Sequence, residues 1–336
     1  MIVTCAFDSA MINLGLYKRC KSRGERAITM ERKRTAYLNE IMSSEAREDV
    51  KVGLRNLWTR IEKAERQIGE SLEDGYSREK FIKLLSLLKP GAETTFRTQK
   101  SVIQKYINRI FGKNDAVLES IKYSDLDASV IYEAGFFRDF SALRASVKEA
   151  LNNSVQDESV YFPVVSGFYL AWIGLTKEEA ITLKIEDMQG DCIKIAGRNI
   201  YPNAEIMKYL RDYAAADEIL IIDSNKERRR VLVPSVYLLR TITKDRISKE
   251  ILKHKIWEFN RSCGSDFEYN KIYWSGIYNR AYIYEMQNGK LDEENIDLLS
   301  GIFQENYAAA RVPKNAVELR LGSYRKFRDY FYPKPE

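Results

Sequence analysis

The amino-acid sequence predicts a mainly α-helical protein that carries a small antiparallel β-sheet, an α+β fold. Three observations lead to this prediction. Apolar residues recur at helical spacing through the first half of the chain. One strand–turn–strand pattern, "DCIKIAGRNIYPN", lies at 191–203 in the second half. Between the halves, residues 152–160 are polar and without periodicity, which is typical of a linker. We therefore expect a poorly ordered leader over 1–44, a helical domain over 45–151, that linker, and a second domain over 161–332.

The first domain is predicted to be a helical bundle. Its first helix covers 47–68, with apolar side chains on one face at Leu54, Trp58, Ile61 and Ile68. Ser77 is a good helix N-cap and Pro90 a helix stop, which places a second helix between them. The third helix lies within 92–113, and its apolar face comprises Phe96, Ile103, Ile107 and Ile110. Two more helices are expected within 123–151, giving about four or five in all.

The second domain begins with an apolar run that ends at Gly174. Thr176 and Glu179 then have the spacing of a capping box, in which each side chain bonds the other residue's backbone N–H. The predicted hairpin follows, with its turn at 196–198. A third apolar run, 218–222, leads into a basic cluster, and the remainder of the domain is expected to be helical.

Composition excludes several classes of protein. The 336 residues include 54 Lys plus Arg against 48 Asp plus Glu, and this formal charge of +6 is compatible with a polyanionic partner without requiring one. The cysteines lack C-x-x-C spacing, which argues against disulfides or a zinc site and favours a reducing cytoplasm. No apolar stretch approaches the roughly 20 residues that span a bilayer. In the opening segment the basic residues follow the apolar ones, the wrong order for a signal peptide.

His254 is the only histidine of the chain. Zinc motifs such as H-E-x-x-H need two histidines, and a serine or cysteine hydrolase would have to use this one. The stretch "ILKHKIWEF" around it has the pattern of an amphipathic helix, where a lone histidine is usually a surface residue. No phosphate-binding loop and no G-x-G-x-x-G motif occurs. The sequence therefore predicts no metal and no cofactor.

Three segments resemble the tyrosine recombinase (phage integrase) family over roughly residues 90–330. They are "GLTKEEAITLKIEDM" at 174–188, "GRNIYPN" at 197–203 and "SGIYNRAYIYEM" at 275–286. The resemblance implies a helical core-binding domain followed by a domain of the catalytic type, the two closing around duplex DNA. In that family a tyrosine attacks a phosphodiester, and fixed cations stabilise the charge that builds on phosphorus.

The residues at the family's catalytic positions can be compared one by one. The first arginine of the family would stand at Thr176, which carries no charge, and the neighbouring Lys177 does not replace a bidentate guanidinium. The hairpin lysine corresponds to Lys194 or Arg198.

Arg280 takes the place of the second arginine, whereas Ile277 stands where the histidine of the family's His-x-x-Arg box is expected. Near Phe303, where a further histidine or tryptophan is expected, neither occurs. Tyr307, Tyr324 and Tyr330 are the nucleophile candidates, and none lies in a clear family motif. The resemblance therefore implies a recombinase scaffold without recombinase chemistry.

The same segments resemble a narrower group, the catalytically inactive lytic-cycle master repressors of SPβ-like phages. This implies a DNA-binding regulator of a phage or prophage, at the nucleoid in the bacterial cytoplasm. Its partners would be double-stranded DNA, a regulatory phage protein or peptide, and a second copy bound through the C-terminal segment. The candidate DNA contacts are basic residues: Arg97, Lys100, Lys105, Arg109, Lys177, Arg198, Lys226, Arg228, Arg229, Arg230, Arg240, Lys244 and Arg280.

Each basic stretch also has a plainer interpretation. The cations of the third helix in the first domain are explained equally well by a solvent-exposed helix face. Arg240, Lys244 and Arg246 are explained nearly as well by a plain amphipathic helix. Three functions remain open at this point. They are a non-enzymatic DNA-binding regulator, a divergent active recombinase, and a helical interaction protein with no role on DNA.

Overall fold

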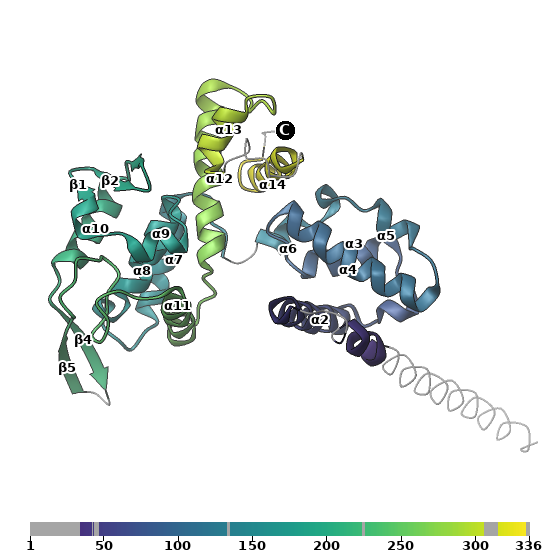
Figure 1. The fold of residues 1–336 in the computed structure, drawn as a ribbon, viewed down its shortest axis with the longest axis horizontal. Coiled ribbons are helices and arrows are strands. Elements are labelled where there is room, and N and C mark those ends of the chain that lie inside the picture. Colours follow the sequence, from purple (N-terminus) through teal and green to yellow (C-terminus); the bar gives the residue numbers. More distant parts are fainter. Residues whose placement is uncertain are drawn as a thin grey trace, which may run out of the picture. The chain divides into compact units, whose positions relative to one another are not determined.

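The computed structural model describes residues 34–41, 43, 47–132, 135–223, 226–305 and 315–333. The chain divides into two compact units, Met1–Asp127 and Ala128–Glu336, which are drawn in Figure 1 and are described separately below. The described residues are mainly helical and include two small antiparallel sheets, so the predicted fold class is confirmed.

The first unit is helical throughout its described part. Its α-helices are α2 (Glu48–Ile68), α3 (Arg78–Leu87), α4 (Glu93–Phe111) and α5 (Ala116–Ser120), and 3-10 turns lie at Leu72–Asp74 and Tyr123–Asp125. The three helices predicted over the first 113 residues are confirmed. Ser77 caps α3 as expected, with its side chain accepting a hydrogen bond from the backbone N–H of Lys80.

Residues 34–41 are also helical and pack into the core of this unit. Arg34 bonds the carboxylates of Glu65 and Glu73, each at 2.6 Å, and its side chain is largely buried. Tyr37 lies edge-on against Trp58, with ring centroids 6.0 Å apart. The prediction of a poorly ordered leader up to residue 44 was therefore wrong for 34–41, and residues 1–33 lie outside the described part of the chain.

The second unit contains the remaining helices and both sheets. Its helices are α6 (Ala128–Tyr132), α7 (Phe140–Asn152), α8 (Phe162–Trp172), α9 (Lys177–Thr182), α10 (Ala204–Ala215), α11 (Lys249–Cys263), α12 (Tyr269–Asn288), α13 (Ile296–Phe303) and α14 (Ala316–Phe331). Its strands are β1 (Met188–Gln189), β2 (Cys192–Ile195), β3 (Arg198–Ile200), β4 (Glu218–Asp223) and β5 (Lys226–Val231). Further 3-10 turns lie at Glu158–Tyr161 and Ile185–Asp187.

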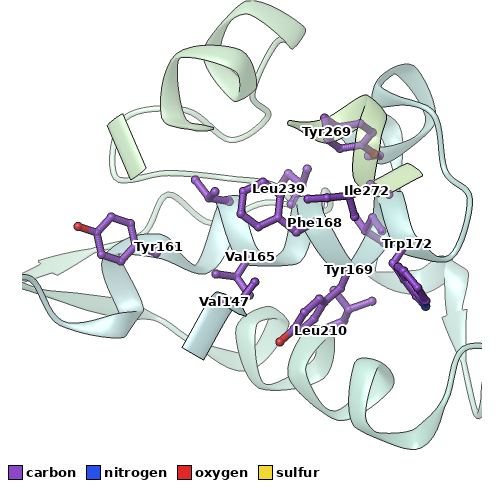
Figure 2. Close-up of a cluster of buried hydrophobic side chains, with 14 of the residues drawn as sticks. Val147, Tyr161, Val165, Phe168, Tyr169, Trp172, Leu210, Leu239, Tyr269 and Ile272 are labelled. Carbon is purple, nitrogen blue, oxygen red and sulfur yellow. The ribbon is translucent and has the colours of Figure 1, made fainter. Parts of the chain in front are cut away.

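Helix α8 is the centre of this unit. Its sequence, "FPVVSGFYLAW", is apolar all round, which suits a helix that is buried on every side. Figure 2 shows Val165, Phe168, Tyr169 and Trp172 of α8 among buried side chains from its neighbours. Helix α12 approaches α8 closely at Gly276, where a Cβ atom would lie 1.9 Å from the backbone oxygen of Trp172. Only glycine permits this backbone contact.

The boundary between the compact units differs from the predicted boundary at 151. The division falls after Asp127, because α7 packs its apolar face into the core of the second unit through Leu143, Val147 and Ala150. The predicted linker, 152–160, is also fixed to this unit. The amide of Gln156 donates to the Ile222 oxygen at 2.6 Å and accepts from the Ile222 N–H at 2.9 Å.

The predicted hairpin is confirmed in the sheet β1-β2-β3. Strands β2 and β3 pair antiparallel, and Ala196 and Gly197 between them both have positive φ, 49° and 73°, which gives the right twist for a two-residue turn. The second sheet, formed by β4 and β5, was not predicted, because β5 consists largely of charged residues. Residues 240–247 do not form the helix that was considered for them; α11 begins after its cap, Ser248.

Candidate functional site

The turn between α8 and α9 has the conformation that its sequence predicts. Gly174 adopts φ +88°, a left-handed conformation that favours glycine, and its N–H bonds the Ala171 oxygen at 2.9 Å. The Thr176 side chain accepts from the Glu179 N–H at 3.2 Å, while the Glu179 carboxylate accepts from the Thr176 N–H at 2.8 Å. Both halves of the predicted capping box are therefore present.

A cavity of about 420 Å³ opens beside this turn. Its lining residues come from the turn, from the β2–β3 hairpin, and from helices α12 and α13: Thr176, Glu179, Arg198, Tyr273, Asp297, Ser300, Gln304 and Glu305. Arg280 lies next to it, since a Cβ atom on Gly174 would be 2.5 Å from Arg280 Nη2 and 2.7 Å from the Gln304 amide nitrogen. The three segments that carry the family resemblance thus meet at one place, which we call the Arg280 pocket.

Arg280 is a partly buried cation with few partners. Its Nη1 donates to the Trp172 backbone oxygen at 3.0 Å, whereas Nη2 is buried without a hydrogen-bond partner among the described residues. Burial, together with the nearby charge of Arg198, lowers the pKa of Arg280 to about 10, although Tyr273 acts in the opposite direction. No carboxylate of the described chain pairs with it.

The other cations of the pocket are neutralised. Glu179 forms a short ion pair with Arg198 in addition to its capping bonds. Glu305 pairs with Arg320, whose Nε lies 3.1 Å from Glu305 Oε2 and whose guanidinium stacks on Trp274 at 3.5 Å from the ring centroid. Asp297 contributes a further, exposed carboxylate to the lining. Two of the three carboxylates that line the pocket, Glu179 and Glu305, are therefore paired with arginines.

The pocket lacks a histidine. Ile277, one turn before Arg280 on α12, is fully buried. His254, the single histidine, lies on α11 with 63% of its side chain exposed, and its Nδ1 is 3.3 Å from Glu258 Oε1. It is not among the residues that line the pocket. The prediction that His254 is a surface residue is confirmed.

The tyrosine candidates have different environments. Tyr324 on α14 is 1% exposed, and its hydroxyl donates to Glu285 Oε2 at 2.5 Å. Burial and the Glu285 carboxylate raise the pKa of Tyr324 far above its usual value, which opposes formation of the phenolate. Tyr307 lies outside the described residues. Tyr273, which lines the pocket, was missed by the sequence analysis although it is seven residues before Arg280 and thus on the same face of α12.

The two candidates for the hairpin cation are separated by the structure. Arg198, at the start of β3, lines the pocket, whereas Lys194 on β2 is exposed and is not among the lining residues. Lys177 on α9 is half-buried and lies 5.6 Å from the centroid of the Tyr269 ring. Burial lowers the pKa of Lys177 below its usual value, and the nearby Lys253 acts in the same direction.

The candidate DNA contacts on α4 differ in how their side chains are bonded within the protein. Arg97 pairs with Glu93 and Arg109 with Glu40, each at 2.9 Å and at the surface, while Lys105 is exposed. Lys100 instead donates to the backbone oxygens of Glu119 and Ile121, at 2.8 and 2.7 Å. Because these bonds tie Lys100 to the end of α5, we leave it out of the proposed DNA contacts.

The candidates of the second unit also divide into two groups. All residues of β5 are exposed, including Lys226, Arg228, Arg229 and Arg230, and Lys244 is exposed in a tight turn. Arg240, by contrast, is 6% exposed, and its Nη2 donates to the oxygens of Ala214 and Ala216 at 3.1 and 2.7 Å. Because it satisfies carbonyls at the end of α10, Arg240 is also left out of the proposed contacts.

The described part of the C-terminal segment packs on its own chain. Arg328 of α14 bonds Glu285 of α12 at 3.0 Å, and Phe327 lies against Tyr132 of α6 with ring centroids 5.8 Å apart. Among the described residues, no helix is long and apolar enough to cross a membrane. In the same residues, no group of three or more His, Cys, Asp and Glu side chains is placed to hold a metal ion.

Comparison with known proteins identifies lambda integrase structures. A lambda integrase(75-356) dimer bound to a COC′ core site is 9% identical, with 91% of this chain and 98% of that chain covered and a TM-score of 0.38. A lambda integrase dimer bound to a COC′ core site is also 9% identical, with 91% and 79% covered and a TM-score of 0.39. A lambda integrase tetramer bound to a Holliday junction is 8% identical, with 79% and 78% covered and a TM-score of 0.36. No protein-family model and no curated protein sequence matches the chain.

Proposed function

We propose that this protein binds duplex DNA on a tyrosine-recombinase scaffold and regulates transcription without cutting the DNA. One observation carries the proposal. The turn at Gly174, the hairpin residue Arg198 and Arg280 meet in a single pocket, although they are far apart in the sequence. This is the arrangement that the family resemblance implies, and it supports the scaffold independently of the motifs themselves.

The chemistry of the pocket supports binding without strand cleavage. A pentavalent phosphate needs several unpaired cations, but Arg198 is paired with Glu179 and Thr176 supplies no charge. Loss of one such donor typically costs about 2.7–4 kcal/mol of transition-state stabilisation. Ile277 also offers no proton donor one turn before Arg280. Among the described residues of the pocket, Arg280 is the arginine without a carboxylate partner, which suffices for contact with a phosphate but not for catalysis.

DNA binding draws support from the exposed cations. The formal charge of the chain is +6, and exposed lysines and arginines lie on both compact units. The proposed contacts are the exposed residues Arg97, Lys105, Arg109, Lys226, Arg228, Arg229, Arg230 and Lys244, together with the partly buried Lys177, Arg198 and Arg280. Contacts of this kind are made mainly to phosphates and weaken as salt concentration rises.

The biological role that we propose is that of a phage or prophage repressor in the bacterial cytoplasm. Its motifs resemble those of the master repressors of SPβ-like phages, and a regulatory phage protein or peptide is the proposed antagonist. A second copy, bound through the C-terminal segment, is a further proposed partner.

The proposal is tested with duplex fragments from the protein's own genomic locus. Binding is measured by fluorescence anisotropy between about 50 and 200 mM salt, where a protein with many phosphate contacts loses affinity steeply. The same protein is incubated with nicked suicide duplexes, and the products are separated on a denaturing gel. We expect salt-dependent binding to a specific fragment and no covalent protein–DNA product.

The alternative is a divergent active recombinase that uses Arg280, Arg198 or Lys194, and Tyr307 or Tyr324. A covalent adduct that disappears in the Tyr307→Phe or Tyr324→Phe variant would replace our proposal with this one. Absence of salt-dependent binding to any duplex would favour the helical interaction protein instead.

A further inference from the structure

The β4–β5 hairpin carries the densest row of exposed cations in the described chain. Four of the first five residues of β5 are Lys or Arg: Lys226, Arg228, Arg229 and Arg230. Every side chain of the strand is exposed. In Figure 1 the hairpin extends away from the helices of the second unit. The sequence indicated only a basic cluster here, whereas the strand gives these residues a fixed spacing.

The two strands differ in how they are held. The backbone N–H of Leu220 in β4 donates to Ser159 Oγ at 2.8 Å, and Gln156 bonds Ile222 on the same strand. Ile219 of β4 belongs to the core of the unit. No described strand pairs with the outer edge of β5. One strand therefore anchors the hairpin, and the other presents its edge to solvent.

The pairing register fixes which cations lie together. Arg230 is opposite Ile219, Arg228 is opposite Ile221, and Lys226 is opposite Asp223, so these three cations share one face. Arg229, opposite Leu220, lies on the other face. Residues two apart on a strand are separated by about 6.6 Å, so these three cations form an evenly spaced row.

The ion pairs of the hairpin do not prevent its arginines from binding a phosphate. Arg228 lies 3.5 Å from Asp223 and is 54% exposed, and Arg229 pairs with Glu218 while 76% exposed. Surface pairs of this kind contribute about 0–1 kcal/mol, so a phosphate can replace the carboxylate at little cost. The major groove of DNA, about 12 Å wide, admits a two-stranded ribbon.

We propose that the β4–β5 hairpin enters the major groove of duplex DNA with the edge of β5 leading. Lys226, Arg228 and Arg230 follow one phosphate backbone, and Arg229 reaches the other. This inference rests on the proposed function, since it identifies one element that makes the DNA contact. A plainer role for the charges is protection of an exposed strand edge against aggregation. Edge protection requires neither arginine nor cations on both faces.

The test compares two variants of the full chain, each lacking two positive charges. Arg228→Gln/Arg230→Gln alters the hairpin, and Lys148→Gln/Lys208→Gln alters exposed lysines on α7 and α10 as the matched control. All four side chains are exposed, so both variants are expected to fold, which circular dichroism checks. Binding to a labelled mixed-sequence duplex is measured against salt concentration.

For the hairpin variant we expect about 10- to 100-fold weaker binding near 0.1 M salt and a salt slope shallower by about 1.8, that is 0.9 for each lost phosphate contact. The control variant is expected to bind nearly as the unaltered protein does. If both variants bind alike, the hairpin inference fails although DNA binding stands. If the unaltered protein does not bind the duplex, the proposed function itself fails.

A second duplex tests the groove. Its cytosines carry a glucosylated hydroxymethyl group at C5, a position that faces the major groove. The ratio of the hairpin variant's Kd to that of the unaltered protein should fall toward one on this duplex, because the groove is already blocked. A ratio unchanged from the plain duplex would overturn insertion into the major groove.

Discussion

Two arginines of the second unit, the buried Arg240 and the partly buried Arg280, make different contacts. Arg240 donates from Nη2 to two backbone oxygens at the end of α10, where carbonyl groups attract a positive charge. Arg280 makes one bond, to the Trp172 oxygen, and lies beside the pocket. Each arginine keeps one buried nitrogen without a partner among the described residues, Nε in Arg240 and Nη2 in Arg280. Burial of an uncompensated cation is unfavourable. We therefore interpret Arg240 as a structural residue and Arg280 as a residue kept for a ligand.

This difference predicts that the same substitution has effects of different size at the two positions. Arg240→Met should lower the free energy of unfolding by about 2–3 kcal/mol, because bonds from a charged donor to two carbonyls are lost. Arg280→Met should change it by less than about 1 kcal/mol, since removal of the unpaired charge offsets the lost bond to Trp172. Urea denaturation followed by circular dichroism measures both. An equal loss in the two variants would mean that Arg280 is structural.

The residues of the Arg280 pocket were only partly predictable. Arg280 and Thr176 could be placed from local motifs. Gln304 could not, because its position depends on how α13 packs against α12, which no short-range pattern records. Glu179 was predicted as a capping residue, and its second role as the partner of Arg198 depends on the packing of the hairpin.

At the scale of elements, the helical segment 34–41 stabilises the first unit through buried ion pairs. Arg34 reaches Glu65 on α2 and Glu73 in the following 3-10 turn, and both carboxylates are largely buried. Burial alone would raise the pKa of Glu73, but hydrogen bonds from Ser71 and Tyr106 and the charge of Arg34 bring it below its ordinary value. The two buried carboxylates have a counter-charge only while the Arg34 cation is present.

Removal of that cation should destabilise the first unit strongly. In Arg34→Ala, two buried carboxylates lose their counter-charge, which typically costs about 3–5 kcal/mol. Arg109→Ala breaks the exposed pair with Glu40 on the same segment and should cost less than about 1 kcal/mol. Urea denaturation at neutral pH compares the two. Similar small losses would show that the segment does not stabilise the unit.

The Arg34 effect should also depend on pH. Because the folded pKa of Glu73 is lowered, its contribution to stability is present above the ordinary glutamate value of 4.5 and is lost as the pH falls through the folded value. The difference between the unaltered protein and Arg34→Ala should therefore shrink below about pH 4.5.

Elements with strong local signals were predictable, and those defined by distant contacts were not. Helix α3 begins at the Ser77 cap, and the β2–β3 hairpin turns at Ala196 and Gly197, as their sequences indicate. Strand β5 has almost no apolar residue and forms because β4 pairs with it over six positions. This strand depends on its pairing with β4, and it could not be predicted from its own sequence, which is mostly basic.

At the scale of the whole molecule, a polar stretch proved a poor guide to the boundary between units. Residues 152–160 look like a linker, but Gln156 and Ser159 bond to β4 within the second unit. The division after Asp127 follows instead from burial. Tyr132 of α6 packs against Phe327, and the N–H of Phe137 donates to Ser275 of α12 at 3.0 Å. Helices α6 and α7, which precede α8 in the chain, therefore belong to the second unit.

Two fragments distinguish the boundaries. The fragment 128–336 keeps α6 and α7 and should fold alone, with a cooperative thermal transition and the far-ultraviolet circular dichroism of a helical protein. The fragment 152–336 begins at the sequence-based boundary and removes Leu143 and Val147, which are buried in the core. Loss of even one such side chain costs about 2–5 kcal/mol, and α7 supplies several, so this fragment should aggregate or lack a cooperative transition. If 152–336 unfolds as cooperatively and at the same temperature as 128–336, α7 is dispensable and the boundary lies where the sequence placed it.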